Sequence, residues 1–124
     1  MTDPARIQRV TADQRVPGPP TPGMDRQQAF QTEGTWAGYA RTEPNMRSGW
    51  HHHGEYESTI YVLAGALRME WGTGDDVVDA GPGDFVFVPK HVVHREGNPS
   101  AEVGEFVVVR AGHGEPNFNV DGPA

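Results

Sequence analysis

The sequence predicts an all-β protein built as an antiparallel sandwich or barrel of short strands. Short runs of β-branched, aromatic and other apolar residues recur along the chain, and Gly, Pro and Asp turn residues separate them at regular intervals. Helical signals are nearly missing, since only residues 25–31 suggest a short helix. The length of 124 residues corresponds to one domain.

The strand signals begin near residue 35. A first strand is predicted at 36–41, and after a loop a second strand carries the histidines at 51–53. Further strands are predicted at 59–63, 66–71, 77–79, 85–88 and 105–110. The strand at 85–88 ends at Pro89, because proline has no N–H to donate to a sheet.

The segment before these strands has a different composition. Residues 16–23 contain four prolines and two glycines, and such a stretch cannot hold a helix or a central strand. We therefore expect an extended arm at 1–24, followed by a barrel domain at 25–124. The arm is either a loose tail or a segment that packs on a second copy of the chain.

Charge and composition exclude several classes of partner. The net charge is −7 and Lys90 is the only lysine, whereas binding to nucleic acid requires a basic surface. No apolar run approaches the ~18 residues that cross a bilayer, and the first residues lack the apolar core of a secretory signal. Cysteine is missing, so disulfides and thiolate ligands are excluded. We expect a cytoplasmic protein with a small-molecule partner.

Three consecutive histidines are the strongest functional signal. Side chains alternate between the faces of a strand, so His51 and His53 share one face and His52 takes the other. His94, from a distant strand, can supply a third imidazole. Because imidazole is the commonest protein ligand of transition metals, His51, His53 and His94 are predicted to bind one metal ion.

The segment around His94 resembles the second motif of the cupin superfamily, written G-x5-P-x-G-x2-H-x3-N. It begins at Gly83, continues through Pro89 and His94, and ends at Asn98. One position departs from the motif, because His91 stands where the family has glycine.

The first cupin motif, G-x5-H-x-H-x(3,4)-E-x6-G, is matched at His51, His53 and Glu57. Asn45 replaces its first glycine, and the spacing from Glu57 to Gly65 is one residue too long. The resemblance covers residues 35–111. It implies a double-stranded β-helix, or jelly-roll barrel, with one divalent transition metal ion per chain: Fe, Zn, Ni, Mn or Cu.

The resemblance also implies a fourth ligand, a glutamate. Counting forward from His53 gives Glu57, whereas counting back from Gly65 gives Ser58. If Ile60 and Val62 face the interior, Ser58 does too and Glu57 faces out, unless a bulge reverses the alternation. Either Glu57 is the ligand, or three histidines are completed by water or substrate.

A site of this kind supports metal-assisted chemistry, and cupins include both enzymes and binders. We expect an enzyme of the dioxygenase or the lyase/isomerase type, with His91 or Tyr39 as the proton-transfer residue. A non-catalytic module that binds or senses a small molecule is one alternative. An accessory cupin that works with a partner protein is another. Since cupins commonly pair through strands and N-terminal arms, we expect a homodimer.

Overall fold

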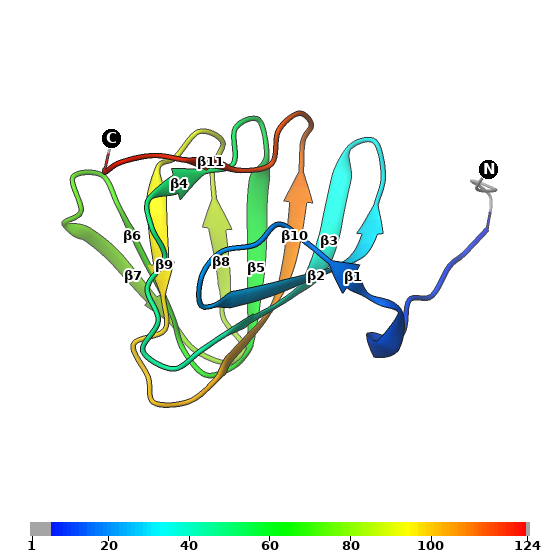
Figure 1. Cartoon of the computed structure of the whole chain (residues 1–124), viewed down its shortest axis with the longest axis horizontal. Helices are drawn as coiled ribbons and strands as arrows, with labels where there is room; N and C mark the ends of the chain where they lie inside the picture. The colour runs from blue at the N-terminus through cyan, green and yellow to red at the C-terminus, as the bar shows by residue number, and fades with distance from the viewer. Residues whose placement is uncertain (1–5, 124) are drawn as a thin grey trace.

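The computed structural model describes residues 6–123 and confirms the all-β class. Two antiparallel sheets face each other and enclose the core (Figure 1). The six-stranded sheet has the order β1 (Val16–Pro17), β2 (Met24–Gln31), β3 (Thr35–Thr42), β10 (Gly104–Ala111), β5 (Glu57–Ala64), β8 (Phe85–Val88). The five-stranded sheet has the order β11 (Phe118–Asn119), β4 (His51–His52), β9 (His94–Gly97), β6 (Leu67–Trp71), β7 (Asp76–Ala80).

Alternation along the strands divides the interior into two zones. On β10, Phe106 and Val108 are buried against Ile60 and Val62 of β5, as expected for strands with one face inward. The same inward series of β10 ends in Arg110. The barrel therefore has an apolar core at one end and a polar interior at the other.

The short helix suggested at 25–31 is wrong, because this segment is strand β2. It pairs with β3 over nearly its whole length, from Met24 opposite Thr42 to Gln31 opposite Trp36. Pairing with a neighbouring strand supplies backbone hydrogen bonds that outweigh the weak local preference of a polar heptapeptide.

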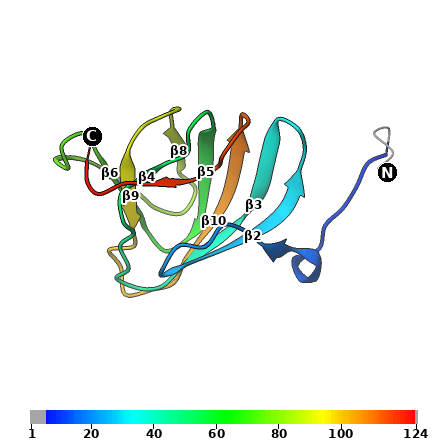
Figure 2. The same ribbon diagram turned by 45° about the horizontal axis from the view of Figure 1, so that its top comes forward.

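Part of the predicted arm joins the barrel. Val16 and Pro17 form β1, which pairs with β2, and Gly18 N–H donates to the carbonyl of Arg26 at 2.7 Å. Residues 6–14, including a short 3₁₀ turn (Ala12–Gln14), extend away from the barrel (Figures 1 and 2), and Arg15 packs over the ring of Tyr39 on β3. Among residues 6–123, no helix has the length and apolar character needed to cross a membrane.

Two turns keep a left-handed backbone without glycine. Asn45 and His91 have φ angles of 59° and 62°, and they are the only non-glycine residues with positive φ in the described part of the chain. Both occupy positions where the cupin motifs have glycine, the residue that adopts this conformation without steric cost. The two turns therefore keep the left-handed conformation that glycine favours, although other residues occupy these positions.

Candidate metal centre

Four buried side chains converge at the polar end of the barrel. His51 and His53 come from β4 and the residue that follows it, and His94 and Glu96 come from β9. One potential ligand atom from each of the four lies within 4.8 Å of the others. Metal–ligand bonds of about 2.0–2.2 Å allow ligand atoms up to about 4.4 Å apart, so only small shifts would bring these four onto one ion.

Backbone carbonyls orient all three imidazoles in the same way. The Nδ1 atoms of His51, His53 and His94 lie 3.0, 2.8 and 2.9 Å from the carbonyl oxygens of Gly49, Pro116 and Val92. A carbonyl oxygen only accepts, so each Nδ1 carries the hydrogen and each Nε2 presents its lone pair. This is how metal-binding histidines are usually held. The buried Nε2 of His51 has no hydrogen-bond partner among the described residues.

Glu96 supplies the carboxylate of the group. Its Oε1 lies 3.1 Å from Nη2 of Arg26 and 3.3 Å from Nε2 of His51. Burial opposes ionisation of Glu96, but His51 and the charge of Arg26 hold its pKa well below the ordinary value. Glu96 is therefore an ionised oxygen ligand beside three imidazole nitrogens, and this donor set fits a divalent transition metal.

Burial keeps the imidazoles of His53 and His94 neutral. The pKa of His53 is lowered to about 2, first by burial and then by the charge of Arg110. The pKa of His94 is also lowered, mainly by burial. Neutral imidazoles are the form that binds metal, so protons do not compete for these two side chains near neutral pH.

The structure brings together the three predicted histidines but places Glu96 with them in the position predicted for Glu57. Ser58, Ile60 and Val62 face the interior, so the alternation runs without a bulge at Glu57, which is half-buried outside the group. The spacing of the cupin motifs does not identify Glu96 as a ligand. The alternation of side chains along β9 could have identified it, because His94 and Glu96 are two residues apart on one face.

The other candidate residues lie apart from the four ligand candidates. Tyr39 is on the outer face of β3, where it hydrogen-bonds to Glu105; burial and that carboxylate raise the Tyr39 pKa. His91 is exposed and its Nε2 lies 3.0 Å from Oε1 of Glu55. His52 points away from the cluster and stacks on Phe118, with ring centroids 4.8 Å apart. Neither Tyr39 nor His91 lines the cavity beside the four ligand candidates.

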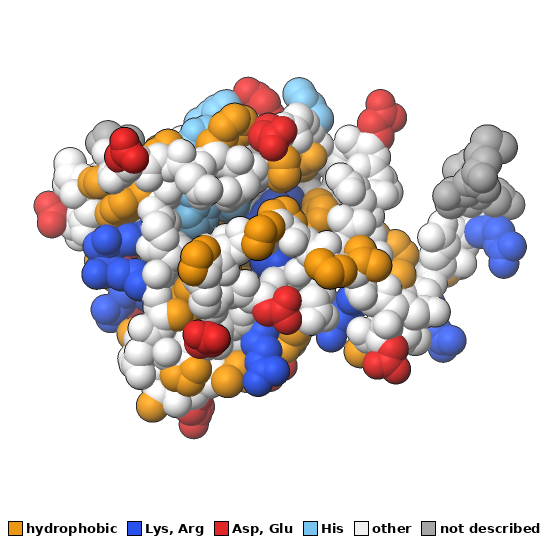
Figure 3. Space-filling model, in the orientation of Figure 1, with side chains coloured by type: hydrophobic (Ala, Val, Ile, Leu, Met, Phe, Trp, Pro, Cys, Tyr) orange, Lys and Arg blue, Asp and Glu red, His pale blue; other side chains and the backbone are white. Residues whose placement is uncertain are grey.

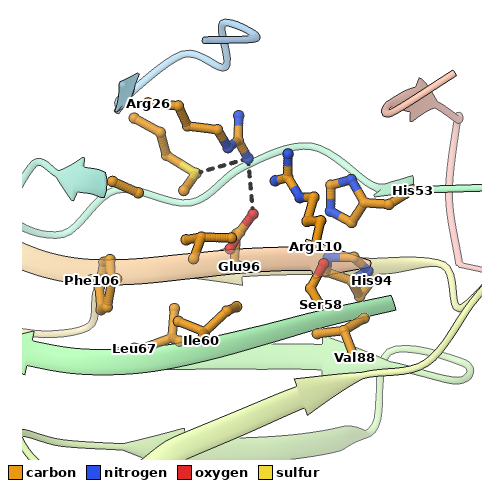
Figure 4. Close-up of a pocket in the computed structure, with 13 residues that line it drawn as sticks. Arg26, His53, Ser58, Ile60, Leu67, Val88, His94, Glu96, Phe106 and Arg110 are labelled. Carbon is orange, nitrogen blue, oxygen red and sulfur yellow. Dashed lines mark hydrogen bonds and ion pairs between the residues drawn. The ribbon is translucent and has the colours of Figure 1, made fainter. Parts of the chain in front are cut away.

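A narrow cavity lies beside the four ligand candidates. Its free volume of about 10 Å³ is close to what one water molecule occupies. His53, His94, Glu96 and Arg110 line its polar end, and Phe106, Leu67 and Ile60 line its other end (Figure 4). In the space-filling view, histidine and basic side chains are visible in a hollow of the molecular surface (Figure 3).

A larger apolar groove of about 350 Å³ also reaches His94. It lies where β8 and β7, the terminal strands of the two sheets, leave the barrel open. The groove is lined by Met69, Trp71, Val78, Phe85, Val86, Phe87, Val88, Pro89, Val92 and His94. Its size and apolar character are those of a site for a small organic ligand.

Comparison with known sequences and structures agrees with this architecture. The family model described as the cupin domain matches residues 38–110. An uncharacterised conserved protein with a double-stranded β-helix domain from Klebsiella pneumoniae superposes with a TM-score of 0.76 and 21% identity, covering 98% of each chain. The polyketide cyclase RemF from Streptomyces resistomycificus gives a TM-score of 0.76 and 21% identity, covering 93% of this chain and 86% of that one.

A third structural neighbour is a manganese protein. Oxalate decarboxylase from Bacillus subtilis, whose Mn(II) centres have been studied, gives a TM-score of 0.69 and 18% identity, covering 79% of this chain but 28% of its own. No curated protein matches the sequence. At these identities the structural neighbours establish the fold, which is the predicted double-stranded β-helix.

Proposed function

The chain belongs to the cupin domain family, and we propose that it is a metal-dependent enzyme acting on a small organic molecule. The observation that carries this proposal is the shared orientation of the three histidines, whose Nε2 atoms all remain available while their Nδ1 atoms are bound to carbonyls. A purely structural histidine cluster would not need all three rings held in one tautomer beside an ionised carboxylate.

We also propose a class of reaction for this metal centre. A bound divalent metal ion would supply Lewis-acid activation of a carbonyl or carboxylate, or redox chemistry if it is iron. The chain's own residues orient the ligands, and the apolar groove at His94 excludes water from the organic part of a substrate. The polyketide cyclase and the oxalate decarboxylase among the neighbours favour a lyase or isomerase over a dioxygenase.

The test is turnover by the metal-loaded protein. Purified protein loaded separately with Mn(II), Fe(II), Ni(II) and Zn(II) is screened against small organic acids and carbonyl compounds, with product detection by mass spectrometry. The His94→Ala variant should lose turnover while its circular dichroism spectrum stays unchanged. Full activity in His94→Ala would contradict the proposal.

The second candidate is a module that binds a small molecule without converting it. The positions of His91 and Tyr39 favour this alternative, since neither predicted proton-transfer residue lines the cavity. Saturable binding with no product after long incubation of the metal-loaded protein would support it over the enzyme.

A further inference from the structure

Two buried polar atoms beside the candidate metal centre have no hydrogen-bond partner in the part of the chain that the structure describes. Nε of Arg110 and Oγ of Ser58 are both buried without a hydrogen-bond partner among residues 6–123. Arg110 is 4% exposed and Ser58 is 2% exposed. Buried polar groups are nearly always hydrogen-bonded, so an unpartnered pair requires an explanation.

The two unpartnered groups are adjacent. Arg110 on β10 is the direct cross-strand partner of Ser58 on β5, so both side chains project from the same position of the sheet. Both line the cavity that His53, His94 and Glu96 also line. Figure 4 shows the Arg110 guanidinium beside the ring of His53, and Ser58 close to His94.

A second buried arginine, Arg26, differs from Arg110 because its guanidinium is hydrogen-bonded within the protein. Arg26 is also 4% exposed, but its guanidinium donates to the carbonyl of Pro19, to Thr21 and to Glu96. The arginines that form ion pairs in the described chain are Arg26, Arg47, Arg68 and Arg95. Arg110 is absent from this set, and its guanidinium lies over the ring of Trp36, 5.0 Å from the ring centroid.

The charges around the cavity are unbalanced. Among the side chains lining it, Arg26 and Arg110 are two cations and Glu96 is the one carboxylate. Arg26 already forms an ion pair with Glu96, and the same carboxylate is the one that attracts Arg110, so two buried cations share one carboxylate. A divalent ion at the four ligand candidates would add to this excess. Buried charges are stable only when paired and hydrogen-bonded, so the cavity lacks one anion.

We propose that Arg110 and Ser58 bind a carboxylate group of the small molecule that the metal centre holds. The guanidinium supplies charged donors in a planar fork that matches a carboxylate, and the Ser58 hydroxyl supplies one more donor. This inference rests on the proposed function, and it names the chemical class of the ligand: an organic acid, oriented with its carboxylate toward β10 and β5.

The test uses acetate and its neutral isostere acetamide as probes. Co(II)-loaded protein is titrated with each probe and followed by its visible absorption spectrum. Wild-type protein should respond to acetate and not to acetamide. Arg110→Met should bind acetate roughly 10- to 100-fold more weakly, and Ser58→Ala about 2- to 10-fold more weakly. Arg68→Met removes the same charge from an exposed ion pair on β6 and should bind acetate as the wild type does.

Undiminished acetate affinity in both Arg110→Met and Ser58→Ala would overturn the inference. Uptake of Co(II) by every variant would then leave the proposed metal centre intact. If the protein takes up no Co(II), the proposed function fails instead. Acetate is then titrated into metal-free protein, where the NMR signal of the Arg110 Nε–H should shift. An unshifted signal overturns the inference in that case as well.

Thermal unfolding separates a ligand-binding arginine from a structural one. Replacing an unpaired buried cation by an apolar side chain of similar length should leave the Tm of Arg110→Met unchanged or raised. A lowered Tm together with normal acetate binding in Ser58→Ala would assign Arg110 a structural role. If Arg110→Met does not fold, the acetate affinity of Ser58→Ala, which lacks a single oxygen, tests the inference in its place.

Discussion

His51 and His94 lie directly opposite each other on β4 and β9, with ring centroids 4.5 Å apart. Backbone pairing therefore fixes two of the four potential ligands before any metal binds. His53 and Glu96 each lie two residues further along their own chain, and because β4 and β9 are antiparallel they flank the His51–His94 pair from opposite sides on the same face. A site on paired strands is more rigid than a site on loops, which favours a preorganised metal centre.

The fourth ligand is tested by two matched variants. Glu96→Gln removes the carboxylate charge from the group of four and should weaken Zn(II) binding by at least about 10-fold. Glu57→Gln makes the same change outside that group and should leave the affinity unchanged. Competition with a chromophoric chelator measures both. Weakened binding only in Glu57→Gln would restore the assignment made from the cupin motif.

The stability of the metal-free protein should depend on pH through the buried histidines. The pKa of His53 falls to about 2 in the folded protein, against about 6.5 in the unfolded chain. Below about pH 6.5 the unfolded chain binds a proton that the folded one does not. The free energy of unfolding should therefore fall with decreasing pH, by up to about 1.4 kcal/mol per unit for each such group. The lowered pKa values of His94 and Glu96 act in the same direction.

Urea unfolding of metal-free protein between about pH 7 and pH 5 measures this dependence. His53→Asn is the matched variant, because its amide nitrogen can still donate to the carbonyl of Pro116. Its dependence on pH should be shallower than that of the wild type. Equal slopes in the two proteins would show that His53 does not titrate as the structure indicates.

The left-handed turn at His91 predicts an unusual order of stabilities. Glycine adopts a φ of 62° without the steric cost that alanine carries there, so His91→Gly should be more stable than His91→Ala by about 1 kcal/mol. Both variants lose the contact with Glu55, so the comparison cancels that contribution. Thermal unfolding measures the difference, and a more stable alanine variant would contradict the assigned backbone strain.

We propose that the chain forms a homodimer through its N-terminal arm. Residues 6–14 extend from the barrel, and Ile7 is fully exposed (Figure 1). Deletion of residues 1–14 leaves β1, the contact of Arg15 with Tyr39 and the contacts of Arg26 with Pro19 and Thr21 in place. Light scattering should then show a weakened dimer. An unchanged dimer would move the interface elsewhere, and a monomeric full-length chain would contradict the proposal.

Most strands could be predicted from the sequence, because alternation and turn residues are local signals. The apolar runs at 59–63, 85–88 and 105–110 became β5, β8 and β10 within two residues at each end. The polar strand β2 was missed because its stability comes from pairing with β3, a contact distant from the local pattern. The short strands β1 and β11 were also missed, because they lie in Pro- and Gly-rich segments that have little local preference for a strand and form by pairing with β2 and β4.

The candidate site was only partly predictable. The spacing of His51, His53 and His94 identified three of its members, since a motif match and the period of a strand agreed. Glu96 and Arg110 gave no motif signal, because each becomes notable only through burial and its neighbours. The tail beyond residue 112 contributes the Pro116 carbonyl that orients His53, which its composition alone did not indicate.

The most direct test of the metal centre is the metal content of untagged protein, measured by inductively coupled plasma mass spectrometry beside the His94→Ala variant. We predict about one transition metal ion per chain in the wild type and a loss of that ion in the variant. His113→Ala, in the tail, is the matched control and should keep the metal. Protein that takes up no metal under any loading condition, or equal content in wild type and His94→Ala, would contradict the metal centre.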